Sequence, residues 1–277
     1  MSAPQVGDRA PAGAVAAYWR LLVANVRGQA QYRVSFAIDL ASNAGFAILD
    51  VVSVLVLFLV TPALAGFRPS EVFLMTALAM VGFSLADLAV GNVERLREYV
   101  RTGLLDAVLM RPLRVLPQLL ALDFAFRRVG RLVQSVLLLG IAFAVVDIDW
   151  TLTRAAAALL APLVGAVMFS SIFVAGATVA FWWIESGELA NAFTYGGRDF
   201  TIYPVTIYAG WFRKLFAFGL GFAFVAYYPA LVLLDRPDPL GAPDAVRWLG
   251  PVVALVAAGL AGLLWRTGIR HYRSTGS

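Results

Sequence analysis

Long apolar runs alternate along the chain with shorter segments that carry most of the charged residues. Runs of about 18 or more apolar residues are typical of transmembrane helices, because about 20 helical residues cross about 30 Å of hydrocarbon. The pattern predicts six spans, at about 36–60, 71–92, 129–147, 155–183, 212–234 and 247–266. Lone strands would leave backbone groups unpaired in lipid, so all six are expected to be helices. The fourth is longer than a perpendicular crossing needs, and we expect Pro162 to kink or break it.

Two segments outside these runs have patterns of their own. Within residues 14–33, apolar side chains recur at helical spacing, with arginines largely on the other face, which predicts an amphipathic helix lying in the membrane interface. Residues 235–248, DRPDPLGAPDAVRW, are rich in Pro and Asp and predict a turn-prone outer connection, with a short re-entrant helix left open.

Composition supports a membrane protein, since 61% of residues are hydrophobic and only 14% are charged. Soluble domains carry about 25% charged residues. If both termini are inside, the inner segments hold most of the 22 basic residues, with the densest group between Arg95 and Arg131. This skew predicts an N-in, C-in topology. The net charge of +5 is then an orientation signal and a contact for anionic lipid, and nucleic acid is not an expected partner.

The second inner connection, between the fourth and fifth spans, contains glycines and acidic residues. Its members are Glu185, Gly187, Glu188, Gly196, Gly197 and Asp199. We expect a flexible connection here, with a second contact to a soluble partner as the alternative.

Several kinds of chemistry are excluded by missing residues. The chain has no cysteine, and its single histidine, His271, stands close to the C-terminus, so no His- or Cys-based metal or catalytic site is expected. The only lysine, Lys214, lies between Arg213 and Leu215, so the Gly-Lys-Ser/Thr of a P-loop is absent. We therefore expect no catalytic residues, and transport would have to be driven by an ion gradient or by a partner.

An ion-gradient carrier would place ionisable residues within its spans. The candidates are Asp39, Asp50 and Asp87, with Asn43 beside them, and Asp50 is the deepest in the predicted spans. The commoner role of such residues is a helix–helix hydrogen bond or the wall of a wet cavity. Aromatic residues of span five, among them Phe218 and Phe222, would either line a path or simply pack. Asp50, Asp87, Phe218 and Phe222 are therefore candidate translocation-path residues.

The longest inner connection, residues 93–128, begins NVERLREYVRTGLLDAVLMRP. Glu94 and Glu98 lie one helical turn apart with arginines between them, which favours a helix stabilised by its own ion pairs. We expect Gly103 to end that helix and residues 104–110 to form a second one before Arg111-Pro112. A bent helical pair on the inner face suits contact with a soluble motor, although an ordinary loop is the alternative.

Three segments together resemble the ABC-2 type transport permeases. They are YVRTGLLDAVLMRPLRVLPQ at 99–118, YPVTIYAGWFRKLFAFGLGFAFVAYYPALVLL at 203–234 and the terminal GIRHYRSTGS at 268–277. The order and spacing match over nearly the whole chain. The family pattern has a Pro near 219–221, where this chain has GLG, which puts the bend of span five in doubt.

The resemblance implies a permease subunit of an ATP-binding-cassette exporter in the bacterial cytoplasmic membrane. Residues 1–33 would be a cytoplasmic N-terminus with an elbow helix, 34–266 the six-span domain and 267–277 a cytoplasmic tail. A second permease subunit, identical or related, would complete the pore, and separate ATPase subunits would bind ATP and Mg. Carry-over from the family places the ATPase contact at Glu94, Glu98, Arg101, Gly103, Asp106, Arg111 and Pro112. An ion-gradient-driven secondary transporter is the alternative.

Overall fold

The computed structural model describes residues 63–122 and 127–272, together with a few separate positions between residues 23 and 56. The expected elbow helix at 14–33, nearly all of the first span and residues 273–277 lie outside this part. Within the described ranges the chain is helical, with a single β-bridge between Leu64 and Phe67 in place of any strand. The predicted all-α class is confirmed for this part of the chain.

The helices differ widely in length. The long ones are α3 (Pro69–Val90), α7 (Arg127–Val145), α8 (Leu152–Thr178), α9 (Gly187–Thr201) and α12 (Gly250–His271). Between α3 and α7 lie η1 (Gly91–Arg95), α4 (Leu96–Arg101), α5 (Leu104–Leu109) and α6 (Val115–Leu122). The other short elements are η2 (Val179–Phe181), η3 (Ile184–Ser186), η4 (Val205–Ile207), α10 (Gly210–Arg213), the π-helical η5 (Lys214–Gly219), η6 (Phe222–Phe224), α11 (Tyr227–Leu233) and η7 (Asp244–Trp248).

Four helical stretches of the described residues are long and apolar enough to cross a membrane: Pro69–Arg101, Arg128–Val145, Leu152–Phe181 and Gly250–His271. The pair Gly210–Gly219 and Phe222–Leu233, bent by 60°, makes a fifth if it is counted as one span. The chain is thus a multi-pass membrane protein. Pro162 does not break α8, which is continuous on both sides of it.

Helix ends explain where two spans begin. Pro69 takes the first position of α3, and the Glu71 carboxylate accepts a hydrogen bond of 2.7 Å from the backbone N–H of Arg68. The hydroxyl of Thr151 caps α8 by accepting from the backbone N–H of Arg154 at 3.2 Å. Both starts are set by local residues, so they are readable from the sequence.

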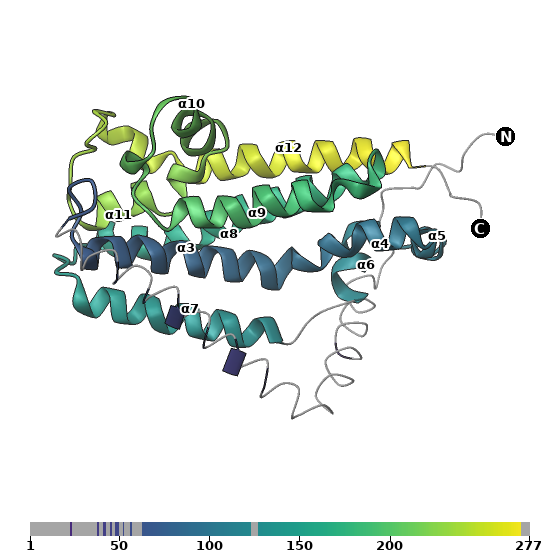
Figure 1. The fold of residues 1–277 in the computed structure, drawn as a ribbon, viewed down its shortest axis with the longest axis horizontal. Helices are drawn as coiled ribbons and strands as arrows, with labels where there is room; N and C mark the ends of the chain where they lie inside the picture. Colours follow the sequence, from purple (N-terminus) through teal and green to yellow (C-terminus); the bar gives the residue numbers. More distant parts are fainter. Residues whose placement is uncertain are drawn as a thin grey trace.

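The long helices lie side by side (Figure 1). α3 and α7 run in opposite directions, since Asp87 near the end of α3 pairs with Arg131 near the start of α7. α12 runs with α8, because Gly268 near its end lies against Thr178 at the end of α8. The termini of α4, α5 and α12 therefore gather at one end of the bundle.

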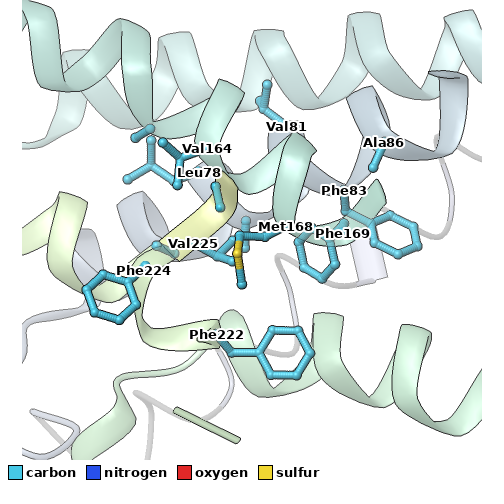
Figure 2. Packing of buried hydrophobic residues seen from close by; sticks show 14 of the residues in the cluster. Leu78, Val81, Phe83, Ala86, Val164, Met168, Phe169, Phe222, Phe224 and Val225 are labelled. Atoms are coloured by element: carbon cyan, nitrogen blue, oxygen red, sulfur yellow. The ribbon is translucent and has the colours of Figure 1, made fainter. Parts of the chain in front are cut away.

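Small residues let α3 and α8 approach closely. A Cβ on Gly82 would lie 3.0 Å from the Cα of Gly165. Beside this crossing, Phe83 packs edge-on against Phe169, with ring centroids 5.2 Å apart (Figure 2). Helices in lipid associate by such close packing, because lipid chains are as apolar as the side chains they would replace.

Residues 187–201 form helix α9, where the sequence suggested a flexible connection; that expectation was wrong. One end of α9 meets α4, where Arg97 lies against Gly187. Beyond its other end, the Thr76 hydroxyl donates to the carbonyl of Ile202 at 3.1 Å. Since Thr76 stands in the first turns of α3, α9 runs back alongside α3 in the opposite direction.

The glycines of α9 provide room for neighbouring side chains. A Cβ on Gly187 would lie 1.6 Å from Nη1 of Arg97, and one on Gly197 would lie 2.2 Å from the ring of Phe222. Close approach thus explains the glycines at these two positions. A sequence pattern cannot separate that use of glycine from use in a flexible loop.

The expected span at 212–234 is broken into two helical pieces, Gly210–Gly219 and Phe222–Leu233, bent by 60°. After passing along α9 the chain turns back, so that Phe216 stacks on Phe193 with 6.2 Å between centroids. It then returns, and Tyr227 of α11 meets Phe67 beside the start of α3 at 6.1 Å. The end of α8 and the start of α12 lie at opposite ends of the bundle. The chain therefore runs from one end to the other through α9, which begins at Gly187.

The break within this segment lies at Gly221, in the GLG that departs from the family pattern. Gly221 is left-handed, with φ of 77°. A Cβ there would lie 2.8 Å from Met168 Cε and 2.9 Å from Val253 Cγ1. The bend that was in doubt is present, and glycine provides it because any side chain would be both strained and crowded.

The course of the chain through α9 slightly changes the number of basic residues that belong to the inner segments. Arg198, which falls within the predicted inner connection between the fourth and fifth spans, lies over the Phe83 ring of α3, 5.7 Å from its centroid. Arg213 and Lys214 belong to α10 and η5, whose Phe212 and Phe216 pack on Phe200 in the later part of α9. The basic group between Arg95 and Arg131 is unaffected, so the skew in charge persists.

Candidate functional site: the bent helical pair and the junction beneath it

The helices α4 and α5 form the bent pair predicted for the loop after α3. Gly103 joins them in the left-handed conformation, with φ of 72° and ψ of 1°. A side chain there would cost roughly 1–2 kcal/mol, which explains the glycine. α5 begins at Leu104 and gives way before Arg111 and Pro112, as expected. Both the break at Gly103 and the second helix are confirmed.

The bent pair presents apolar side chains on two sides. Leu105 and Val108 are buried at 0% and 4% exposure and hold α5 on the bundle. Met110 and Leu104 are 86% and 53% exposed on the other side. The exposed residues around them include Arg101, Arg111 and Pro112. An apolar centre within a basic rim is typical of a protein docking surface.

Glu98 belongs to the exposed surface of the pair. Its carboxylate lies 3.4 Å from Nη2 of Arg95, and both side chains are about half exposed. Such a pair contributes at most about 1 kcal/mol, so Glu98 remains available to a partner.

Asp106 faces the end of α12. The Tyr272 hydroxyl donates a hydrogen bond to its Oδ1 at 3.1 Å. Burial raises the pKa of Tyr272 to about 12, with the hydrogen bond and the charge of Asp106 adding to the effect. The contact brings together two of the quoted motifs, 99–118 and 268–277, and it ties the bent pair to the last span.

Glu94 faces the interior and lies off the surface of the bent pair. Its Oε2 accepts from the Tyr195 hydroxyl at 3.4 Å, and its Oε1 is buried without a hydrogen-bond partner among the described residues. Glu94 and Arg97 both line a cavity of about 130 Å³ between η1, α8 and α9.

Asp87 is held between two arginines at the junction of α3 and α7. It is 3% exposed, and its oxygens lie 2.9 Å from Nε of Arg128 and 2.7 Å from Nη1 of Arg131. Arg128 also donates to the side-chain oxygen of Asn92. The carboxylate is thus neutralised within the fold and joins two helices. Asp50, Asp39 and Asn43 lie outside the described residues.

The two aromatic candidates differ in position. Phe222 is 1% exposed and packs on Phe169, with 6.1 Å between ring centroids (Figure 2). Its ring also lies 6.1 Å from that of Phe200. Phe218 of η5 is 44% exposed. Phe222 is therefore a core residue, and only Phe218 faces outward.

Sequence reasoning missed the polar face of α9. Glu188, Tyr195 and Asp199 are exposed along a helix that packs between α3 and α8 on its other side. These residues recur at spacings of seven and four. That spacing is the helical signal that would have identified this face, and its three glycines obscured it.

Comparison with known families gives one match. A family described as ABC-2 family transporter protein matches residues 44–276 of this chain. No curated protein and no solved structure shows a significant match.

Proposed function

Because the chain belongs to the ABC-2 family of transporter proteins, we propose that it is the permease subunit of an exporter powered by a separate ATPase. ATP and Mg would bind to the ATPase, and this chain would form the translocation path. The family match supports transport across the membrane, and the direction of transport and the ATPase contact are parts of the proposal.

The single observation that supports ATPase coupling is the exposed apolar centre of the bent pair. A side chain that is 86% exposed, as Met110 is, gains most by being covered in a complex. Arg101 and Arg111 beside it suit an acidic rim on the ATPase. The contact set we propose is Glu98, Arg101, Leu104, Met110, Arg111 and Pro112.

Movement of the bent pair would reach two long helices directly. The Tyr272–Asp106 hydrogen bond joins α5 to α12, and the contact of Arg97 with Gly187 joins α4 to α9. An ATPase that binds one arrangement of these helices more tightly than another would shift the permease between two states. Coupling needs no reactive group on this chain.

A second permease copy is the proposed cover for the polar face of α9. Charged side chains in a membrane-spanning region are costly in lipid and usually face water or protein. Glu188 and Asp199 are exposed on this face, and so are Ala192 and Gly196, which allow another helix or a substrate to approach. We place the translocation path between the two copies at α9.

The ion-gradient carrier gains no specific support from the structure. Of its candidates, Asp87 is already paired with Arg128 and Arg131. Its carboxylate is therefore already engaged in holding α3 and α7 together.

Substitution of Met110 tests the coupling proposal. Met110→Glu introduces a buried, unpaired charge into the contact and is expected to weaken co-purification with the ATPase at least about tenfold. Substrate-stimulated ATP hydrolysis should fall with it, while membrane insertion is unchanged. Glu98→Arg should weaken the complex in the same direction.

Met110→Leu is the matched control, since it keeps the apolar contact and should leave assembly intact. Unchanged assembly in Met110→Glu would place the ATPase elsewhere. Transport that stops on collapse of the ion gradient, and not on ATP depletion, would favour the carrier.

A further inference from the structure

The cavity between η1, the end of α8 and the start of α9 has a mixed lining. Phe173 and Ala177 of α8 form an apolar wall, and Glu94, Arg97 and Asn191 provide polar groups. Its volume of about 130 Å³ is below the ~300–1,000 Å³ of pockets for drug-sized ligands. It is large enough for a small head group or for about four waters.

The carboxylate of Glu94 has an unmet hydrogen-bonding capacity here. Oε1 is buried and has no partner among the described residues, while Oε2 accepts one long hydrogen bond from Tyr195. Buried polar atoms are nearly always paired, and an unpaired one costs about 1–3 kcal/mol. An ammonium group would satisfy this oxygen with a charge-assisted hydrogen bond.

Arg97 supplies a positive charge to the same cavity. Its guanidinium lies across Gly187, which has no side chain to push it away. A guanidinium is well suited to bind phosphate or carboxylate oxygens. Acidic and basic groups from one turn of the chain thus line a single small space.

We propose that this cavity binds a small zwitterion, with its ammonium on Glu94 and its anionic oxygens on Arg97. The apolar wall of Phe173 and Ala177 would cover the carbon atoms between the two charges. Phosphoethanolamine has this chemistry, either as a free molecule or as the head group of a phospholipid. Its test measures binding to this chain without the ATPase, so the outcome does not depend on the proposed function.

Titration of the purified full chain with phosphoethanolamine, followed by calorimetry, tests the site. Glu94→Gln and Arg97→Gln should each weaken binding at least about tenfold, since each removes one charge-assisted contact. Ethanolamine carries only the ammonium group and inorganic phosphate only the anionic oxygens, so each should bind more weakly than phosphoethanolamine. Asp149→Asn, at a carboxylate that is 97% exposed and outside the lining, is the control and should bind normally.

Lipid nanodiscs separate the two sources of the ligand. If the ligand is a lipid, native mass spectrometry should find phosphatidylethanolamine retained by the wild type over phosphatidylglycerol, and lost in Glu94→Gln. If it is a free molecule, only the soluble titration responds. Asn191→Leu fills the cavity without altering either charge, and it should abolish whichever binding is seen. Equal binding in all variants, or none in either assay, would overturn the proposal and leave the cavity to water.

Discussion

Asp87 shows how this protein holds a charge within apolar helices. Two arginines of α7 neutralise it, and one of them also binds Asn92 in η1. A buried ion pair contributes little in total, but loss of one partner leaves the other charge uncompensated. The cluster therefore fixes where α3 ends and α7 begins, more than it adds to stability.

Asp87→Asn should destabilise the protein strongly. Arg128 and Arg131 would lose their shared carboxylate, at a cost of about 3–5 kcal/mol. The thermal unfolding of the purified chain measures the change. Asp149→Asn is the control, because that side chain is 97% exposed and should have little effect. Equal stability of the two variants would contradict a structural role for Asp87.

The Tyr272–Asp106 contact should restrain α5. Tyr272→Phe keeps the ring against Phe181 and removes only the hydroxyl, so α5 should open more often. A loss of about 1–2 kcal/mol predicts roughly 5–30-fold faster amide exchange in residues 104–109. Asp106→Asn should weaken the same contact, and the double variant should add little. Additive effects would show that the two residues act separately.

The same contact has a defined dependence on pH. Because the pKa of Tyr272 is raised from 10.0 to about 12, its hydroxyl stays protonated and donating at neutral pH. The stabilisation is fully present below about pH 10 and is lost as the pH rises through about 12. The difference between wild type and Tyr272→Phe should thus stay constant from about pH 6 to about pH 9.

The role of a residue could be predicted from the sequence only where it depends on the local backbone conformation. Gly103 was identified because a glycine between two helical patterns indicates a left-handed turn. Glu94 and Glu98 lie one helical turn apart and both have arginines as neighbours in the sequence. Nevertheless, Glu94 lines a cavity and Glu98 is exposed. Their difference depends on α9, which begins only at Gly187, far along the chain from both.

At the scale of elements, α3 and α8 depend on a close crossing of small residues. Gly82→Ala should destabilise this crossing, because its Cβ would lie 3.0 Å from the Gly165 backbone, which cannot move aside alone. We expect a cost of about 1–3 kcal/mol in thermal unfolding.

Gly259→Ala in α12 is the matched control. Nothing lies within 4 Å of the position its Cβ would take, so it should be neutral or slightly stabilising, as alanine favours helix. If both variants behave alike, close packing of α3 on α8 is not what holds these helices.

The pattern of apolar runs predicted the uniformly hydrophobic helices. It did not predict the structure of segments in which apolar residues alternate with glycines and charged residues. α3, α7, α8 and α12 correspond to predicted spans. α9 carries glycines and charges, and it is a helix because α3 and α8 cover one of its faces. The residues after it are apolar enough for a span, but Gly221 breaks them into two helical pieces bent by 60°.

At the scale of the whole molecule, the second copy that we propose to cover the polar face of α9 can be tested by cross-linking. The chain has no cysteine, so single cysteines can be introduced without a background. Ala192→Cys, on the exposed face, should form disulfide-linked dimers in membranes when oxidised. Leu159→Cys, which is 75% exposed on α8, should not. Similar cross-linking at both positions, or none at residue 192, would argue against this interface.

The sequence by itself determined that this is a helical membrane protein without P-loop chemistry, and it located the bent pair after α3. Those features follow from runs of apolar residues, from missing residue types and from a glycine between helices, all of which are local. Only the tertiary structure placed Glu94 in a cavity, Asp87 between two arginines and Tyr272 on Asp106. It also made a helix of residues 187–201, because contacts between distant segments decide whether a mixed segment is covered or exposed.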